Sequence, residues 1–230
     1  MSNSNIVSFS IIIPTYNESE NVLRLIREIE KNLPTSDFTE IVIVDDNSPD
    51  GTGKLVENYI NQQKSTTEKE GSPKTKNYRI KIVHRIGKNG LIPAIMDGVK
   101  QSSGQNVIIM DADFSHPPDV IPKMMQELKM NPNSIIIGSR YIEGGKVVGW
   151  PKKRRLLSTG ASILARFGLN VRRVKDPMSG LFALPRELIE NISIDTKGYK
   201  ILLEILVKNK EIPTKEIPYT FIDRQSGKSK

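Results

Sequence analysis

The sequence predicts one α/β domain built on a mostly parallel β-sheet that helices flank on both faces. Short apolar runs alternate with segments of helical periodicity over most of the chain, which is the rhythm of a sheet assembled from β-α-β units. The runs do not alternate between polar and apolar residues, as is typical of parallel strands buried on both faces. No sharp linker or internal repeat divides the 230 residues, so we expect residues 1–230 to form a single domain.

The first four expected elements alternate strand and helix. Phe9–Pro14 is an apolar run that predicts a buried strand. Glu18–Leu33 repeats its apolar residues at intervals of three and four, which predicts an amphipathic helix. Glu40–Asp45 predicts a second buried strand, and Thr52–Gln63 is expected to be helical.

The same alternation continues through the middle of the chain. Apolar residues in Arg79–His84, Asn106–Met110 and Ser134–Gly138 predict three further strands. Leu91–Gln101 and Pro118–Met130 predict the helices between them. The second of these helices opens with prolines, which are favoured at a helix start.

The remaining segments follow a different pattern. Residues 64–77 are polar and rich in Lys, Thr, Ser and Glu, which predicts a mobile surface excursion. Leu156–Phe167 predicts an amphipathic helix behind a basic run, and Gly198–Lys208 predicts a strongly apolar helix. Thr214–Ile222 predicts a strand, and the polar tail Arg224–Lys230 follows it.

The chain is basic, with a formal net charge of +8 and a pI of about 9.5. Such a surface attracts anions, whether nucleic acids, acidic lipid headgroups or phosphorylated substrates. Basic residues gather in the run Lys152–Arg155 and downstream at Arg166, Arg172, Arg173 and Lys175. Aromatic residues make up 6% of the chain and are not interleaved with these cations, so stacking on single-stranded nucleic acid is poorly supported.

The composition also limits the kinds of site and of membrane contact. The sequence contains no cysteine, which excludes disulfides and Cys-ligated zinc or iron–sulfur sites. Its N-terminus lacks the basic-then-apolar pattern of a signal peptide. No apolar run reaches the roughly 18 residues of a membrane-spanning helix. We therefore expect membrane contact to be peripheral, or to depend on a partner subunit or on a transmembrane continuation after residue 230.

The most informative stretch is N-V-I-I-M-D-A-D-F-S-H-P-P at 106–118, where an apolar run ends in Asp111 and Asp113. Open α/β sheets bind ligands at the carboxyl ends of their strands. Hard oxygen ligands suit Mg²⁺ or Mn²⁺, which typically lies between a carboxylate and the phosphates of a substrate. The alternative is a loop whose acidic residues cap the helix that begins near Pro117.

Two earlier strands also end in polar residues. P-T-Y-N-E follows the first at 14–18, and the second runs into D-D-N-S-P-D-G-T at 45–52. Tyr16 can offer a flat ring or a hydroxyl, Asp46 can accept hydrogen bonds from a base or ribose, and Asp113 can hold a metal against a diphosphate. Taken separately, the two segments are also compatible with a helix start and a plain turn. Three adjacent parallel strands would gather all three ends in one crevice.

Together, P-T-Y-N-E, V-D-D-x-S-x-D-G-T and D-A-D-x-x-H-P-P resemble the family 2 inverting glycosyltransferases of the GT-A (Rossmann-like) fold. Later motifs resemble the polyprenyl-phosphate branch of that family, the dolichol-phosphate mannosyltransferases. These motifs are G-S-R-Y at 138–141, E-G-G-K-V at 143–147, D-P-M-S-G-L-F-A at 176–183, G-Y-K-I-L-L-E-I-L at 198–206 and G-K-S-K at 227–230. The resemblance covers the chain apart from its first few residues and residues 64–77. It implies a metal-dependent enzyme that transfers mannose with inversion from GDP-mannose to dolichyl (polyprenyl) phosphate, which supplies dolichyl phosphate mannose for glycosylation.

The resemblance also implies which residues carry the reaction. The donor would be bound by Pro14, Tyr16, Asn17, Glu18, Val44, Asp46, Ala112, Asp113, Arg140, Lys200, Arg224 and Lys230. The catalytic residues would be Asp113, Arg140 and Arg224.

The same resemblance assigns Asp111, Asp113 and Ser115 to a Mg²⁺ or Mn²⁺ ion, and Arg154 and Ser158 to the acceptor phosphate. Ser115 stands where some members carry Gln, and because serine is a shorter and weaker ligand, we expect water to complete the metal's shell. The metal and the basic residues would neutralise the leaving diphosphate in an oxocarbenium-like transition state. A lipid phosphate is already anionic near neutral pH, so no strong general base is expected.

Three alternatives stay open on the sequence. The donor can instead be UDP-glucose or another nucleotide sugar, because Asp46 can accept from guanine or from uracil. The protein can also be a non-catalytic basic protein that binds nucleotide sugar or nucleic acid, or a nucleotide-sugar sensor without turnover, although we expect no nucleic-acid partner. The expected location is the cytoplasmic face of a membrane, with Lys152–Arg155 toward the lipid, where each basic residue contributes roughly 1 kcal/mol.

Overall fold

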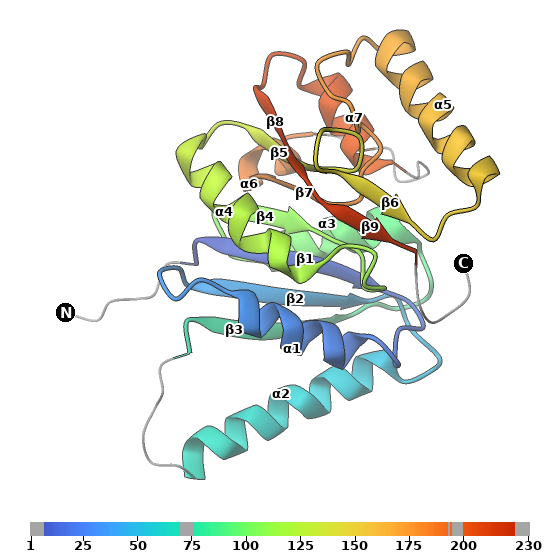
Figure 1. Cartoon of the computed structure of the whole chain (residues 1–230). Helices are drawn as coiled ribbons and strands as arrows, with labels where there is room; N and C mark the ends of the chain where they lie inside the picture. Colours follow the sequence, from blue (N-terminus) through green and yellow to red (C-terminus); the bar gives the residue numbers. More distant parts are fainter. Residues whose placement is uncertain (1–6, 70–75, 193, 195–199, 224–230) are drawn as a thin grey trace.

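The computed structural model describes residues 7–69, 76–192, 194 and 200–223. These residues form one seven-stranded sheet and a separate two-stranded ribbon (Figure 1). In spatial order the sheet contains β3 (Tyr78–His84), β2 (Thr39–Asp45), β1 (Phe9–Thr15), β4 (Asn106–Ile109), β7 (Phe182–Pro185), β5 (Ile135–Ser139) and β8 (Thr214–Pro218). The ribbon pairs β6 (Lys146–Val148) with β9 (Thr220–Ile222).

The sheet is mostly parallel, as the sequence predicts. Strand β1 pairs in parallel with β2 and with β4, and β2 pairs in parallel with β3. Only β7, among the described strands, runs antiparallel to its neighbours β4 and β5. Every residue of β2 is buried, which is the behaviour expected of an apolar strand covered on both faces.

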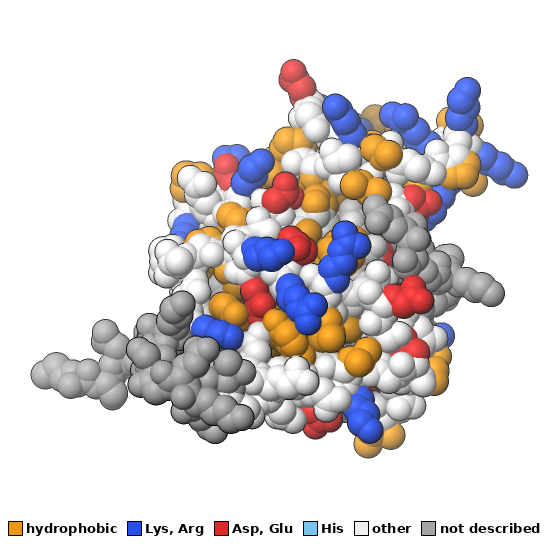
Figure 2. Space-filling model, turned by 60° about the horizontal axis from the view of Figure 1, so that its bottom comes forward, with side chains coloured by type: hydrophobic (Ala, Val, Ile, Leu, Met, Phe, Trp, Pro, Cys, Tyr) orange, Lys and Arg blue, Asp and Glu red, His pale blue; other side chains and the backbone are white. Residues whose placement is uncertain are grey.

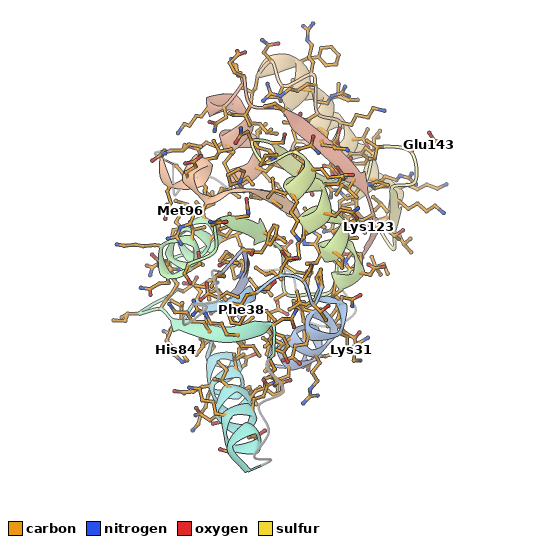
Figure 3. All side chains as sticks on the ribbon, turned by 90° about the vertical axis from the view of Figure 1, so that its left-hand side faces the viewer. Lys31, Phe38, His84, Met96, Lys123 and Glu143 are labelled. Atoms are coloured by element: carbon orange, nitrogen blue, oxygen red, sulfur yellow. The ribbon has the colours of Figure 1, made fainter. Side chains whose placement is uncertain are left out.

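Helices cover both faces of the sheet. One face carries α1 (Val22–Asn32), α2 (Thr52–Lys69) and α4 (Ile121–Met130), and the other carries α3 (Leu91–Gln101), α6 (Arg186–Glu190) and α7 (Ile201–Lys208). In a view turned by 90°, Met96 of α3 and Lys123 of α4 lie on opposite sides of the sheet (Figure 3).

Strand β1 shows how the two faces of the sheet are filled. Ile11 and Ile13 belong to the core cluster under α1 and α4, whereas Ile12 belongs to the cluster under α3. This alternation follows from the two-residue repeat of a β-strand. Helix α1 buries Val22, Leu25, Ile26 and Ile29, which are spaced at the intervals of one helix face.

Several predicted boundaries are wrong. The helix expected to end at Gln63 continues to Lys69, so the first part of the predicted 64–77 excursion is helical. The strand predicted over Thr214–Ile222 is two strands, because β8 pairs with β5 whereas β9 pairs with β6. The helix predicted over Pro118–Met130 begins with a short 3₁₀ turn, η1 (Pro118–Val120), before α4.

Helix α5 (Lys152–Gly168) also begins earlier than the sequence predicts, so the basic run forms its first turn instead of preceding it. The helix predicted from Gly198 begins at Ile201, and residues 195–199 lie outside the described part of the chain. Strands β6 and β7 and the short helix α6 were not predicted, because three to five residues are too few to reveal a periodicity.

Across the described residues, the structure contains no helix with both the length and the apolar character needed to cross a bilayer.

Gly98, in α3, offers a test of how tightly the sheet and its helices pack. A Cβ atom at this position would lie 2.5 Å from Ile12 Cγ2 and 2.8 Å from Val44 Cγ2. Alanine normally stabilises a helix relative to glycine by about 0.5–1 kcal/mol, but overpacking a core costs about 1–3 kcal/mol. We expect Gly98→Ala to lower the free energy of unfolding, measured by urea denaturation.

A matched substitution separates the two effects. Gly160, in the middle of α5, has nothing within 4 Å of the position that a Cβ atom would take. Gly160→Ala should therefore raise the free energy of unfolding by about 0.5–1 kcal/mol. An increase of similar size for both variants would show that α3 packs less closely against β1 than the distances at Gly98 require.

Candidate active site

The carboxyl ends of β1, β2 and β4 lie side by side, because β1 pairs in parallel with both neighbours. Just beyond the end of β4 the molecule has a cleft of about 460 Å³. Its walls include the residues predicted to bind the metal and the acceptor phosphate, together with two of the predicted donor-binding cations: Asp111, Asp113, Ser115, Arg154, Ser158, Arg140 and Lys200. The structure thus brings the predicted metal-binding and acceptor-binding residues together in one cleft.

His116 supports the segment that carries the two predicted metal-binding carboxylates. The backbone N–H of Asp111 donates a hydrogen bond of 3.0 Å to His116 Nδ1. The imidazole is buried, and its ring meets those of Tyr219 and Phe221 edge-on, with centroids 5.7 and 6.2 Å away. Because Nδ1 accepts this hydrogen bond it carries no proton, and burial, which lowers the pKa of His116, favours the neutral ring. His116 therefore fixes the backbone at the end of β4.

Gly180 brings a second segment against this loop. A Cβ atom at Gly180 would lie 2.9 Å from His116 Cε1 and 3.0 Å from Asp111 Oδ2. Any other residue here would push on the buried ring or on the carboxylate. The motif D-P-M-S-G at 176–180 therefore forms part of the wall that holds Asp111.

The residues at the end of β4 fit a hard divalent cation. Asp111, Asp113 and Ser115 offer two carboxylates and a hydroxyl to the same cleft. Within the described part of the chain, no group of three or more His, Cys, Asp or Glu side chains is arranged to hold a metal alone. Mg²⁺ and Mn²⁺ commonly bind through one or two carboxylates and complete their shells with substrate phosphates and water. The oxygen set suits an ion that binds together with a diphosphate.

Arg140 lies in a buried ion pair on the same cleft. Its Nε and Nη2 each donate to a carboxylate oxygen of Asp176 at 2.8 Å, and Asp176 is completely buried. Burial would lower the pKa of Arg140, but the hydrogen bonds and charge of Asp176 raise it above its ordinary value. The guanidinium carbon also lies 5.2–5.5 Å from the ring centroids of Tyr141, Trp150 and Phe221. Arg140 is thus a permanently charged group with a fixed orientation.

The predicted acceptor residues lie on α5, which forms another wall of the cleft. Arg154 Nη1 donates to both carboxylate oxygens of Asp223 at 3.1 Å, and its guanidinium lies 4.5 Å from the ring centroid of Trp150. The hydroxyl of Tyr141 donates to Ser158 Oγ at 2.9 Å. These contacts hold an arginine and a hydroxyl one helical turn apart on the same helix face.

Lys200 adds a further cation to the cleft. The residue as a whole is exposed, yet it lies among the cleft walls, and burial lowers the pKa of Lys200 despite the charge of nearby Asp111. Arg224 and Lys230, which the sequence assigns to the donor, lie outside the described residues.

The other described residues predicted to bind the donor lie at the same sheet edge but do not line this cleft. They are Pro14, Tyr16, Asn17, Glu18, Val44, Asp46 and Ala112. The segments after β1 and β2 are joined, since the backbone N–H of Asn17 donates to Ser48 Oγ at 3.0 Å and that of Glu18 donates to Thr52 Oγ1 at 2.9 Å.

The loop between β3 and α3 covers two of these residues. Asp46 is buried and accepts hydrogen bonds from Arg85, from the backbone N–H of Asn89 at 3.1 Å and from that of Gly90 at 2.9 Å. Lys88 Nζ lies 4.0 Å from the ring centroid of Tyr16. Asp46 thus anchors the loop, a role that the sequence does not predict.

Several site residues were missed for the same physical reason. Arg85, Asp176, Gly180 and Asp223 act through residues distant in sequence, and no local pattern reveals such contacts. Asp176 and Gly180 do lie in the motif D-P-M-S-G-L-F-A, but nothing in that motif names Arg140 or Asp111 as their neighbours.

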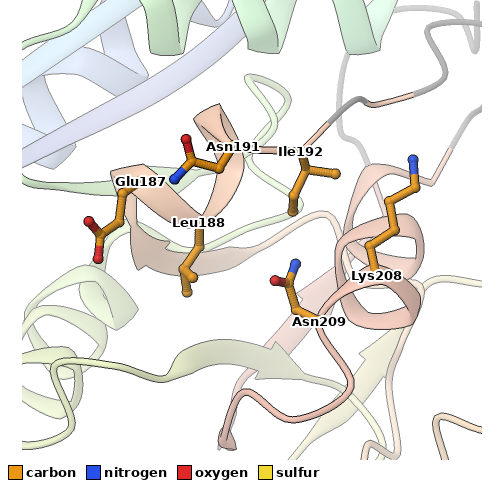
Figure 4. A pocket seen from close by; sticks show the side chains of 6 residues that line it. All are labelled: Glu187, Leu188, Asn191, Ile192, Lys208 and Asn209. Carbon is orange, nitrogen blue, oxygen red and sulfur yellow. The ribbon is translucent and has the colours of Figure 1, made fainter.

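A second hollow, of about 350 Å³, lies between α6 and the end of α7 (Figure 4). It is lined by Glu187, Leu188, Asn191, Ile192, Lys208 and Asn209. Helix α6 begins after Pro185, which is paired with Asn106 at the start of β4. The hollow therefore lies toward the opposite end of β4 from Asp111 and contains none of the predicted site residues.

Comparison with known proteins agrees with this geometry. Residues 10–202 match the family model described as glycosyl transferase family 2. The chain is 42% identical over 222 residues to a dolichol-phosphate mannosyltransferase of Pyrococcus furiosus, covering 96% of this chain and 58% of that protein. It is 32% identical to a dolichol-phosphate mannosyltransferase of Saccharomyces cerevisiae, covering 97% of this chain and 81% of that protein.

The fold is also similar to that of solved structures. A mannosyltransferase from Pyrobaculum calidifontis, in complex with GDP-mannose and Mn²⁺, superposes with a TM-score of 0.64 at 17% identity and covers 96% of this chain and 57% of that one. At this identity the likeness concerns the fold, and it confirms the predicted GT-A architecture. The chain spans little more than half the length of the Pyrococcus and Pyrobaculum proteins.

The buried pair of Arg140 and Asp176 provides a test of the site's electrostatics. Asp176→Asn leaves the guanidinium buried without its counter-charge, which typically costs about 3–5 kcal/mol. We expect the free energy of unfolding, measured by urea denaturation, to fall by an amount in this range.

Asp97→Asn is the matched control. Asp97 accepts from Arg85 at 2.7 Å, but its side chain is half-exposed and Arg85 retains its ion pair with Asp46. The loss should be under about 1 kcal/mol. Equal small losses for both variants would mean that Arg140 does not depend on Asp176 for its charge compensation.

Proposed function

The chain belongs to glycosyl transferase family 2, and on this basis we propose that it transfers mannose from GDP-mannose to dolichyl phosphate, with inversion at the anomeric carbon. The named relatives at 32–42% identity support the mannose and the dolichyl-phosphate acceptor, and the similar structure solved with GDP-mannose supports the donor. The reaction product would be dolichyl phosphate mannose, a mannosyl donor for glycosylation in the membrane.

The observation that carries the proposal is the composition of the cleft. Two carboxylates, Asp111 and Asp113, share its walls with the cations Arg140, Lys200 and Arg154. A site for a single phosphate does not need both kinds of charge. A site that brings a metal-bound diphosphate next to a second, metal-free phosphate does need both.

The donor half of the proposed site lies at the end of β4. Asp111, Asp113 and Ser115 would hold Mg²⁺ or Mn²⁺, which when bound neutralises charge on the leaving diphosphate. Arg140 would donate to the diphosphate from its fixed position against Asp176. Lys200, together with Arg224 and Lys230 beyond the described residues, would add positive charge around the same phosphates.

The acceptor half of the proposed site lies on α5. The planar fork of Arg154 and the hydroxyl of Ser158 would bind the lipid phosphate, and the phosphate would take the place of the Asp223 carboxylate at Arg154. One phosphate oxygen then forms a bond to the anomeric carbon while the bond from that carbon to the GDP oxygen breaks. The electron pair leaves with GDP. The attacking oxygen is already ionised, so the chain needs to supply no general base, and a single displacement inverts the anomeric centre.

The nucleoside half of the proposed site would use Pro14, Tyr16, Asn17, Glu18, Val44 and Asp46, as the family resemblance implies. Asp46 already accepts three hydrogen bonds from the loop between β3 and α3, and a carboxylate offers about four acceptor sites. About one acceptor site remains, so recognition of a base through two hydrogen bonds to Asp46 requires this loop to shift. Lys88 must also leave the ring of Tyr16 if the base stacks there.

We further propose that α5 lies against the cytoplasmic face of a membrane, where the acceptor would be found. Of its residues only Ser162 and Ala165 are buried, whereas Leu156, Leu164 and Phe167 are 75%, 74% and 56% exposed. Lys and Arg side chains gather around hydrophobic ones at the upper right of the space-filling view, over α5 (Figure 2). An exposed apolar helix surrounded by cations is suited to an anionic leaflet.

The two halves of the site can be tested separately. Asp113→Ala should abolish the Mn²⁺-dependent part of GDP binding, measured by calorimetry. Arg154→Ala should leave GDP affinity near that of the wild type but reduce mannose transfer to a short-chain polyprenyl phosphate in detergent by about 10²-fold, because the acceptor is no longer held in line.

Lys146→Ala is the control for this pair, since it removes one exposed positive charge from β6 and Lys146 is not among the residues that line the cleft. It should change neither measurement. If Arg154→Ala weakens GDP binding as much as it slows transfer, then Arg154 contacts the donor and the acceptor assignment is wrong.

The proposed membrane contact through α5 can be tested by vesicle binding. Leu164→Glu should reduce co-sedimentation with vesicles of phosphatidylserine and phosphatidylcholine, because it places a negative charge on the exposed apolar face, and it should leave the unfolding midpoint unchanged. Met130→Glu, at a residue of α4 that is 57% exposed, is the matched control and should bind vesicles like the wild type. Equal vesicle binding by all three proteins would exclude α5 as the contact.

A further inference from the structure

Each of the three strand ends at the site turns through one residue with a positive φ angle. These residues are Asn17 after β1, Asn47 after β2 and Phe114 after β4, with φ of 57°, 60° and 61°. Within the described residues, the only other non-glycine residue with a positive φ is Asn170. Phe114 is therefore the one residue of this group that is not asparagine.

The difference matters because the left-handed conformation is strained for most residues. It brings Cβ too close to the following carbonyl oxygen, and asparagine offsets the clash through local hydrogen bonds of its short polar side chain. Phenylalanine has no such compensation. A bulky residue holds this conformation only where its surroundings impose it, and such strain gathers at functional sites.

The contacts of the ring identify what imposes the conformation. The Phe114 side chain packs against the core cluster under α1, and the guanidinium carbon of Arg24, a residue of α1, lies 4.6 Å from the ring centroid. The flanking residues Asp113 and Ser115 line the cleft, whereas Phe114 does not. The ring is thus anchored outside the cleft, between two residues whose side chains belong to it.

The turn also brings its two flanking residues together. The backbone N–H of Ser115 donates to Asp113 Oδ1 at 3.1 Å, and both residues are buried. This hydrogen bond orients the Asp113 carboxylate from within the turn itself. Release of the turn at Phe114 would break the bond and separate the two proposed ligands.

We propose that Phe114 is a positioning residue for the divalent cation: anchoring of its ring against the core and Arg24 holds a left-handed turn that sets Asp113 and Ser115 on one wall of the cleft. The inference rests on the metal site of the proposed function. This positioning role differs from a purely structural role. In a structural role Phe114 would only fill the core, and any loss of metal binding would follow from a loss of stability.

Two substitutions separate these roles. Phe114→Val keeps an apolar side chain for the core, but its branched Cβ disfavours the left-handed conformation strongly. Phe114→Asn gives up the packing of the ring but adopts the left-handed conformation readily, as Asn17 and Asn47 do. Phe114→Ile retains more apolar volume and serves the same purpose if Phe114→Val does not fold.

The experiment measures the affinity of the full chain for Mn²⁺ in the presence of GDP, from the free Mn²⁺ signal in electron paramagnetic resonance, together with the urea midpoint of the metal-free protein. We expect Phe114→Val to weaken Mn²⁺ binding by about 10-fold or more, the loss typical of residues that orient metal ligands. Phe114→Asn should lower the urea midpoint further than Phe114→Val does, yet change Mn²⁺ affinity far less.

The opposite order would overturn the proposal. If Mn²⁺ affinity follows stability, so that Phe114→Asn binds more weakly than Phe114→Val, the ring acts only as core packing. Absence of Mn²⁺ binding by the wild type with GDP would also overturn it. Tight Mn²⁺ binding by the wild type without any mannose transfer would instead refute the proposed function and leave the role of Phe114 intact.

Discussion

Strand β1 pairs in parallel with β2 on one side and with β4 on the other, and the rest of the site depends on this arrangement. Parallel pairing forces the three apolar runs to end at the same edge of the sheet, with Thr15 opposite Asp45 and Ile12 opposite Ile109. The apolar residues of each strand are buried inside the sheet. The polar residues that follow each strand therefore lie at the edge where the strands end. The burial of apolar strands thereby gathers side chains that are up to about a hundred residues apart in the sequence.

Charged groups at this edge are held in place by neighbouring residues, of which Asp176 and Phe114 lie outside the cleft lining and His116 lies in the cleft wall. Asp176 fixes Arg140, His116 fixes the backbone of Asp111, and the turn at Phe114 fixes Asp113. Each charged group therefore keeps its orientation before any ligand arrives, which reduces the reorganisation that ligand binding and transfer require. The loop between β3 and α3 is the exception, because it occupies Asp46 and covers Tyr16 in the present arrangement.

The sequence predicts the architecture well where a local pattern reports a buried face. The strands around Ile11, Val42 and Ile108 and helix α1 follow directly from their apolar spacing. It also places Asp111 and Asp113 at the sheet edge, because they directly follow the apolar run of β4, whereas Arg154, Ser158 and Lys200 were assigned by the family resemblance and not by a strand pattern. It fails at β7 and β6, which are too short to show a period, and at the break between β8 and β9, which different partner strands determine. It cannot reveal Asp176 or Arg85, because a buried ion pair between distant residues leaves no mark in either local segment.

The measurement that tests the central claim most directly is transfer of radiolabel into organic-extractable lipid by the wild-type chain. The protein would be supplied with Mn²⁺, a polyprenyl phosphate and either labelled GDP-mannose or labelled UDP-glucose. We predict label in the lipid from GDP-mannose alone, and no label when the metal is chelated. Label from UDP-glucose alone would contradict the donor, and mannose transfer that persists at full rate without metal would contradict the role given to Asp111 and Asp113.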